Sequence, residues 1–298
     1  MMNLEIEANL SPQRKPLQHF FENLFRSTSG VVGFIIIVLL VFTAVFANIL
    51  APKPYDLKAP RDRLLPMSFM EGGNPEYLLG TDSLGRDIYS RLIFGSRISL
   101  FVGLASVALG AGIGVTLGLF AGYFGGRVDS FISWLMNIQL SFPYILLALF
   151  LLAAFKGGLG TLIFVLAIGG WVRYARIIRG QVFSVKEEVY ITAAKASGLS
   201  LRRILVKYIL PNAFAPIIVV ASFTMADTIL AEASLSFLGL GIDPSLPSWG
   251  QMLADGRDYI QTEWWISFLP GMAISVTVMG INLFGDWLRD FLDPRLRM

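Results

Sequence analysis

The chain has 298 residues, of which 55% are hydrophobic and only 15% are charged. Soluble domains carry about 25% charged residues, so this balance indicates a protein of the lipid bilayer. The net charge is only +3 and no basic block occurs, which argues against a nucleic-acid partner. Cysteine is absent, and the single histidine, His19, lies in the polar N-terminal segment. These counts exclude thiol nucleophiles, histidine triads and zinc sites in the membrane, so we expect no catalytic residue and no metal ligand.

Six long apolar segments predict an all-α fold, a polytopic membrane protein with six transmembrane helices. Each segment is close to the roughly 20 residues that a helix needs to cross the hydrocarbon region, where helices satisfy every backbone polar group. The first exceeds the roughly 7–15 apolar residues of a signal peptide, and no A-x-A cleavage site follows, so we interpret it as a retained anchor. The predicted helices are 31–51, 98–122, 131–154, 159–180, 209–233 and 264–286.

The distribution of lysine and arginine predicts that both ends of the chain lie in the cytoplasm. Basic residues are more frequent in the segments that this orientation places inside, as the positive-inside rule requires. The long loops 52–96 and 234–263 then lie outside. The predicted parts are a cytoplasmic tail (1–30), the anchor helix (31–51), an extracytoplasmic loop (52–96), a five-helix core (97–287) with a cytoplasmic loop (181–208), and a cytoplasmic tail (288–298).

Tryptophan and proline residues predict further features of the apolar segments. Trp264 and Trp265 open the last segment and Trp287 follows its end, which is typical of aromatic belts at the two membrane surfaces. Pro143 and Pro216 lie inside apolar segments, where proline usually produces a kink.

Glycine recurs at every fourth position of the second apolar segment. Residues with this spacing share one face of a helix and allow another backbone to approach closely. We therefore expect a helix-packing face, and a substrate groove lined by the same small residues is the alternative. The residues are Gly110, Gly114, Gly118 and Gly122.

Charged residues cluster just before the second apolar segment. Asp82 and Arg86 are four residues apart, as are Asp87 and Arg91. Opposite charges at this spacing stabilise a helix. The pattern predicts a short, charge-rich helix at the membrane surface.

The cytoplasmic loop between the fourth and fifth segments predicts two short helices joined by a turn. Glu187 and Glu188 precede the first helix, where the helix dipole favours negative charge. Gly198 suits the left-handed conformation that ends a helix. By itself, the pattern also fits an ordinary amphipathic surface helix. The small residues that would let another surface approach closely are Ala193, Ala194 and Ser197.

This loop resembles the EAA loop of ABC importer permeases, the coupling helix that fits a cleft on the ATPase subunit. The spacing from Ala193 through Gly198 to Pro211 matches that motif. One departure is that Thr192 stands in place of the motif's first glutamate. The residues that the resemblance implies in ATPase coupling are Glu187, Glu188, Ala193, Ala194, Ser197, Gly198, Arg202, Leu210 and Pro211.

Three further segments narrow the resemblance. They are 80–91, 232–250 and 285–294, and with the loop they occur in the same order as in the dipeptide/oligopeptide/nickel permease family. Over residues 20–298 the chain is similar to the "C" subunit of that family. The resemblance implies a type I importer permease core behind the anchor helix.

The same resemblance implies an assembly in the plasma (inner) membrane of a prokaryote. Its other members would be a second, homologous B-type permease subunit, two ATPase subunits and an extracytoplasmic substrate-binding protein, in contact with membrane lipid. ATP and Mg²⁺ would bind to the ATPases, and no cofactor to this chain. Dipeptides, oligopeptides and nickel remain open as the substrate.

Charged side chains at membrane depth are costly and are candidates for function. Asp227 and Glu232 lie in the fifth segment, and a place beside the substrate pathway is one interpretation of both. An internal ion pair is the alternative for Asp227, and a structural role in the following turn for Glu232. At the inner end of the fourth segment we expect arginines that reach lipid headgroups, or else the ATPase or the acidic pair at 187–188. These are Arg173, Arg176 and Arg179.

The sequence contains no G-x-x-x-x-G-K-[ST] phosphate loop, so we expect a transporter subunit rather than an enzyme. A secondary transporter driven by an ion gradient is the alternative. It predicts inverted repeats, which we do not find, and it leaves the EAA-like loop without a role. An intramembrane hydrolase is less favoured, because the chain has no cysteine and no histidine in the membrane.

Overall fold

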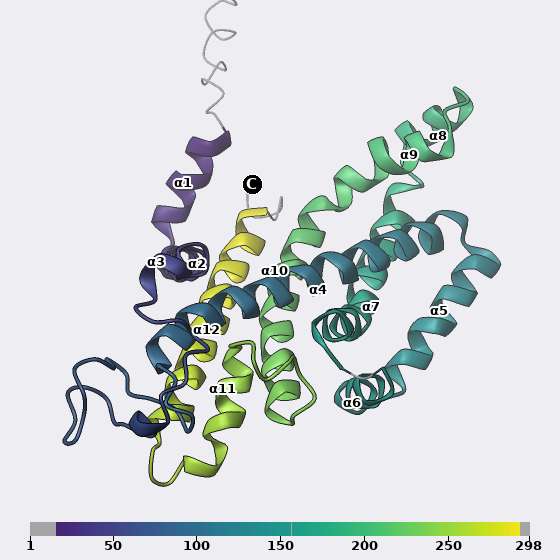
Figure 1. Cartoon of the computed structure of the whole chain (residues 1–298). Coiled ribbons are helices and arrows are strands. Elements are labelled where there is room, and N and C mark those ends of the chain that lie inside the picture. The colour runs from purple at the N-terminus through teal and green to yellow at the C-terminus, as the bar shows by residue number, and fades with distance from the viewer. Residues whose placement is uncertain (1–15, 156, 293–298) are drawn as a thin grey trace, which may run out of the picture.

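Helices make up nearly all regular structure of the computed structural model, which describes residues 16–155 and 157–292 (Figure 1). Within these ranges, the β structure is one isolated bridge between Thr81 and Asp87. The helices are α1 (Pro16–Arg26), α2 (Thr28–Val45), α3 (Ala47–Leu50), α4 (Ile88–Phe124), α5 (Gly126–Leu140), α6 (Tyr144–Ala154), α7 (Leu159–Val185), α8 (Val189–Ala196), α9 (Leu201–Ile204), α10 (Leu210–Phe237), α11 (Trp249–Gly256) and α12 (Trp265–Leu292). Short 3-10 turns lie at Pro60–Asp62 and Arg257–Tyr259, and a π-helical turn at Leu205–Ile209.

Among the described residues, five helical stretches are long and apolar enough to cross a membrane: α2, α4, α7, α9 continued by α10, and α12. The third predicted helix, 131–154, is not continuous, because α5 and α6 meet at an angle of 89°. Pro143 accounts for the break, since proline has no N–H and disfavours a helical conformation at Phe142 before it. It caps α6 instead of lying inside a helix. Counted as one span, α5 and α6 bring the number to six.

The most extensive helix contact joins α4 to α7. A Cβ added at Gly114 would lie 2.3 Å from the carbonyl oxygen of Trp171, and one at Gly118 would lie 2.7 Å from that of Ala175. The backbones therefore touch, and α7 fills the face that could otherwise have formed a groove. The glycines on this face of α4 are Gly110, Gly114, Gly118 and Gly122.

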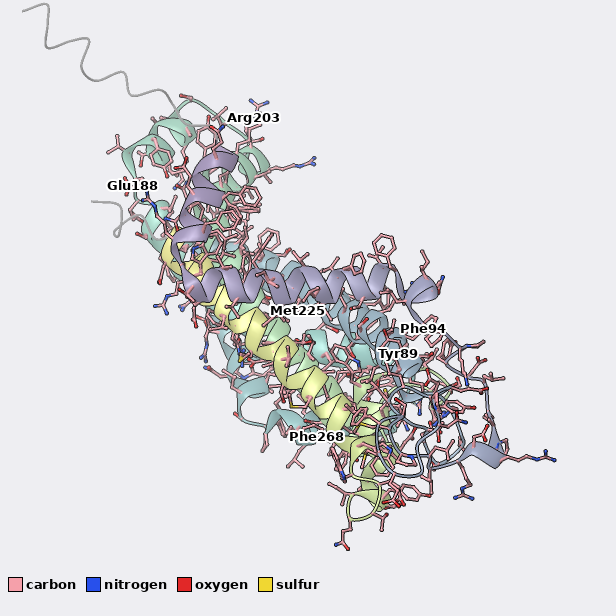
Figure 2. The ribbon with its side chains drawn as sticks, turned by 90° about the vertical axis from the view of Figure 1, so that its left-hand side faces the viewer. Tyr89, Phe94, Glu188, Arg203, Met225 and Phe268 are labelled. Atoms are coloured by element: carbon pink, nitrogen blue, oxygen red, sulfur yellow. The ribbon has the colours of Figure 1, made fainter. Side chains whose placement is uncertain are left out.

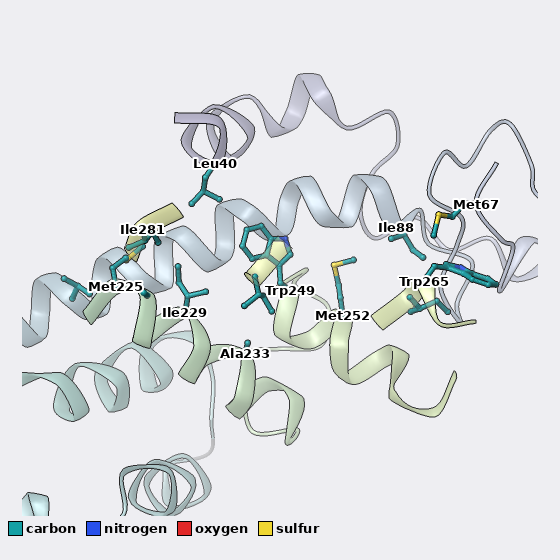
Figure 3. Packing of buried hydrophobic residues seen from close by; sticks show 14 residues of the cluster. Leu40, Met67, Ile88, Met225, Ile229, Ala233, Trp249, Met252, Trp265 and Ile281 are labelled. Carbon is teal, nitrogen blue, oxygen red and sulfur yellow. The ribbon is translucent and has the colours of Figure 1, made fainter. Parts of the chain in front are cut away.

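A second core joins α4 to α2, α10, α11 and α12 (Figure 3). Trp249 of α11 lies at its centre, and the indole N–H donates a hydrogen bond of 3.0 Å to the carbonyl of Leu92. Met225 and Ile229 of α10 pack in the same cluster. The helix α11 lies in the segment 234–263 that we expected to be a loop, and it packs that segment onto the helices.

Two tryptophans expected at the membrane surface are buried inside the chain instead. Trp265 is 6% exposed and belongs to the core of Figure 3. Trp287 is 4% exposed, and the ring of Phe20 meets it edge-on at 5.0 Å. Phe20 belongs to α1, which occupies part of the predicted polar tail. The aromatic-belt prediction is therefore wrong for both residues, and only Trp264 keeps an exposed ring.

The charged residues before α4 form a buried ionic cluster, not the predicted surface helix. Residues 81–87 make a tight turn, and α4 begins directly after Asp87, which caps it. Arg86 donates to Asp82 at 2.6 Å, and Arg91 donates to Asp82 at 2.5 Å instead of pairing with Asp87. Both arginines also reach Asp255 of α11, at 2.8 and 3.0 Å. The cluster of Asp82, Arg86, Arg91 and Asp255 therefore ties loop 52–87 to α4 and α11.

We predict that Asp82→Asn destabilises the protein by about 3–5 kcal/mol, because it leaves two buried guanidinium groups short of a counter-charge. Glu76→Gln is the control. Glu76 is largely exposed and lies 3.7 Å from Lys53, and such a surface pair contributes about 0–1 kcal/mol. The measurement is the thermal unfolding midpoint of each purified variant. Equal midpoints for the two variants would contradict a stabilising role for the cluster.

We also predict that Gly114→Leu prevents normal packing of α4 on α7, at a cost on the order of a few kcal/mol. Gly112→Leu is the matched control, because a Cβ at Gly112 meets no atom within 4 Å. Yield of the assembled complex and transport should fall only for the variant at 114. Normal values for that variant would show that the helices do not need this close approach.

Candidate functional site

The segment 186–209 forms a helix–turn–helix that projects from one end of the molecule. Figure 1 shows α8 and α9 beyond the ends of the other membrane helices, and Figure 2 shows Glu188 and Arg203 far from Tyr89 and Phe268. Gly198 adopts φ +71°, the left-handed conformation expected from the sequence. We call this segment the hairpin.

The two sides of the hairpin differ sharply in exposure. Ile191, Ala194 and Ile204 are buried and pack in one cluster with Ile178 and Val182 of α7. Ala194, only 6% exposed, therefore belongs to the inner side and not to an approachable small face, which corrects that expectation. The exposed side carries Glu187, Glu188, Ala193, Ser197 and Arg202.

The second half of the hairpin continues into α10 without a break. A π-helical turn at Leu205–Ile209 joins the two, and the N–H of Leu210 donates to the carbonyl of Leu205. Pro211 is the second residue of α10, and the helical stretch runs through it without a break. The wider turn accommodates proline, which lacks the N–H that an α-helix would use. Asn212 donates to the carbonyl of Tyr208 at 2.6 Å.

Two arginines of α7 pair with acidic residues of neighbouring helices. Arg173 forms an ion pair with Asp227 of α10, and these side chains are 57% and 55% exposed. Arg179 donates two hydrogen bonds to the carboxylate of Asp129 of α5, at 2.5 and 2.7 Å. The expectation that these arginines reach lipid headgroups or Glu187 and Glu188 is therefore wrong for both, whereas Arg176 is exposed.

The depth of Arg173 also differs from the expectation. The predicted helix ended at 180, which placed the arginines at its inner end. Because α7 extends to Val185, Arg173 lies near the middle of a 27-residue helix. The Arg173–Asp227 pair therefore combines a central position with an exposed surface.

Glu232 is only 1% exposed and lies near the C-terminal end of α10. It accepts a hydrogen bond of 2.8 Å from Ser236. The following loop packs closely here, since a Cβ at Gly241 or Gly250 would touch Ser236. This placement favours the structural role in the turn. Among the described residues, no three acidic or histidine side chains are grouped so that they could hold a metal ion.

Sequence reasoning missed two residues that hold α5 against α7. Gln139 donates to the carbonyl of Ile168 and accepts from the indole N–H of Trp171, each at 2.5 Å. Asp129 was assigned to a short connection, because the apolar segment was taken to start at 131. An acidic residue next to an apolar run, with arginines in the next helix, was the available signal.

Two family models match most of the chain. The model of the family described as binding-protein-dependent transport system inner membrane component matches residues 114–298. The model described as the N-terminal TM domain of oligopeptide transport permease C matches residues 15–66.

Curated relatives extend this result. A di/tripeptide transport system permease of Pseudomonas aeruginosa is 43% identical over 95% of this chain and 93% of its own. An oligopeptide transport system permease of Bacillus subtilis is 39% identical over 92% of this chain and 88% of its own.

The fold is similar to that of a solved importer. An inward-facing structure of the MetNI methionine ABC transporter matches with a TM-score of 0.53 at 22% identity, over 68% of this chain and 96% of that one. This likeness concerns the fold alone. The family models and the relatives show that the chain belongs to the binding-protein-dependent ABC permeases, in their dipeptide and oligopeptide branch, and is a membrane-spanning transport subunit rather than an enzyme.

Proposed function

We propose that this chain forms part of the pathway by which an ATP-driven importer carries short peptides across a bacterial inner membrane. The names of the curated relatives, which are di/tripeptide and oligopeptide permeases, support this substrate class. The partners would be a second, B-type permease subunit, two ATPases that bind ATP and Mg²⁺, and an extracytoplasmic substrate-binding protein.

The observation that carries the proposal is the hairpin with its two unlike sides. Its buried side packs in an apolar cluster with α7, and its exposed side presents small and charged side chains to a partner. An ATPase that binds the exposed side would therefore move a segment that is packed on α7, not a flexible loop. Because α9 continues into α10 through the π-helical turn, the movement reaches Asp227 along one helix.

The Arg173–Asp227 pair favours peptides over nickel as the solute that passes it. Asp227 already has a cationic partner, so the pair presents no net charge to the surface it faces. A bare divalent cation needs uncompensated anionic or neutral ligands, whereas a zwitterionic peptide carries both signs of charge. An ion pair at this depth is costly against lipid, which supports a water-filled or protein-lined environment.

We predict that Gly198→Val uncouples ATP hydrolysis from uptake or releases the ATPase. Valine at φ +71° costs about 1–2 kcal/mol in backbone strain, and that strain would reshape the turn. Gly198→Asn is the matched control, because asparagine tolerates the left-handed region. ATPase activity, peptide uptake and ATPase retention are measured on each purified complex. If valine leaves all three normal, the hairpin is not the coupling element.

We predict that Asp227→Asn lowers peptide uptake while the complex still assembles. If the pair were purely structural, the double variant Arg173→Gln/Asp227→Asn would recover uptake, because it leaves no unpaired charge. Our proposal expects the double variant to stay defective, because the solute has lost both charged groups. Uptake of labelled dipeptides, with assembly checked in parallel, decides between the two.

We predict that both termini are cytoplasmic, which places the hairpin inside and loop 52–87 outside. Because the chain has no native cysteine, single-cysteine variants report this directly. An impermeant thiol reagent added to cells that expose the outer face of this membrane should label Lys58→Cys and spare Lys195→Cys. Labelling of position 195 under these conditions would reverse the topology.

A further inference from the structure

The N-terminal helix α1 has three faces of different character. Phe20 and Leu24 lie against the rest of the chain: Phe20 meets Trp287 at 5.0 Å and Phe291 at 5.5 Å, and Leu24 is fully buried. Asn23, on the same side, accepts a hydrogen bond of 3.2 Å from the indole N–H of Trp287. These contacts fix α1 to the end of α12.

The second face is apolar and exposed. Phe25 is 72% exposed and Phe21 is 42% exposed, and their rings stack at 6.4 Å. Among the described residues, none covers Phe25 as Trp287 and Phe291 cover Phe20. Gln18 and Glu22 border this apolar face and line one shallow groove with the two phenylalanines, and the exposed Arg26 lies on the polar side.

The exposed apolar face continues the surface of α2. Phe21 lies 6.5 Å from the ring of Phe34, more than one turn inside α2. Beyond Phe34, α2 exposes Ile35 (50%) on a helix that passes the test for a membrane span. Figure 2 shows α1 turning sharply away from the line of α2, so that the two helices cannot both run along the membrane normal.

We propose that α1 lies along the membrane surface, with Phe21 and Phe25 inserted into the boundary between lipid headgroups and acyl chains. A short amphipathic helix beside a spanning helix buries its apolar face at this boundary, while its polar face stays in water. The occupant of the face is lipid and not protein, because the face is continuous with the exposed apolar surface of α2. The phenylalanine rings, rather than a cluster of positive charges, provide the attraction, so zwitterionic lipid is sufficient.

Spin labels on single cysteines test this in the assembled importer, reconstituted in phosphatidylcholine vesicles. Oxygen concentrates in the acyl region, and chromium oxalate stays in water, so their relative relaxation effects report the environment of each label. Phe25→Cys and Phe21→Cys should respond more to oxygen than to chromium oxalate. Arg26→Cys should show the reverse order, and Ile35→Cys calibrates the lipid-facing response.

Two results would overturn the proposal. A label at position 25 that responds mainly to chromium oxalate would place this face in water. A label there that responds to neither reagent would place it under another protein subunit. Arg26→Cys removes neither phenylalanine, so its reading holds even if a phenylalanine variant assembles poorly. A label at position 26 that responds mainly to oxygen would place the polar side in lipid and would likewise contradict the proposal.

Discussion

The close approach of α4 to α7 is the contact on which the rest of the structure depends. Glycine leaves room for the carbonyl oxygens of Trp171 and Ala175 to meet the backbone of α4 directly. Such contacts gain dispersion energy and weak Cα–H···O interactions without the need to order long side chains. Because α7 is fixed in this way, its arginines are fixed too, and through them α5 and α10 take their places. The buried side of the hairpin then packs on Ile178 and Val182 of the same helix.

The ionic cluster plays the corresponding part on the opposite side of the molecule. Four charged groups, two of each sign, are withdrawn from water where loop 52–87, α4 and α11 meet. A buried cluster of this kind adds little net stability compared with a well-packed apolar core, but it tolerates only one arrangement of its members. It therefore specifies how the two long loops sit on the helices, whereas the apolar cluster around Trp249 packs α2, α4, α10, α11 and α12 together.

Features that depend on local periodicity could be predicted from the sequence. The glycine spacing, the apolar lengths and the turn at Gly198 are properties of one segment, and each appears in the structure. Arg91 was assigned to Asp87, four residues away, but it bonds to Asp255, which no local pattern indicates. The same holds for Arg173 with Asp227 and for Trp287 with Phe20. A proline at 143 signals a bend, yet its size depends on how α5 and α6 pack.

The π-helical turn at Leu205–Ile209 has a consequence for the phase of α10. An α-helix advances by about 100° per residue, and a π-helical turn contains one residue more than its length accounts for. Every side chain beyond Ile209 is therefore rotated about the helix axis by about one residue's step relative to an uninterrupted helix. The direction in which Asp227 points around the helix axis, relative to the hairpin, thus depends on this one extra residue. Loss of one residue from this turn would restore regular winding and rotate the hairpin and Asp227 relative to each other by about one residue's step, with every residue of α10 itself unchanged.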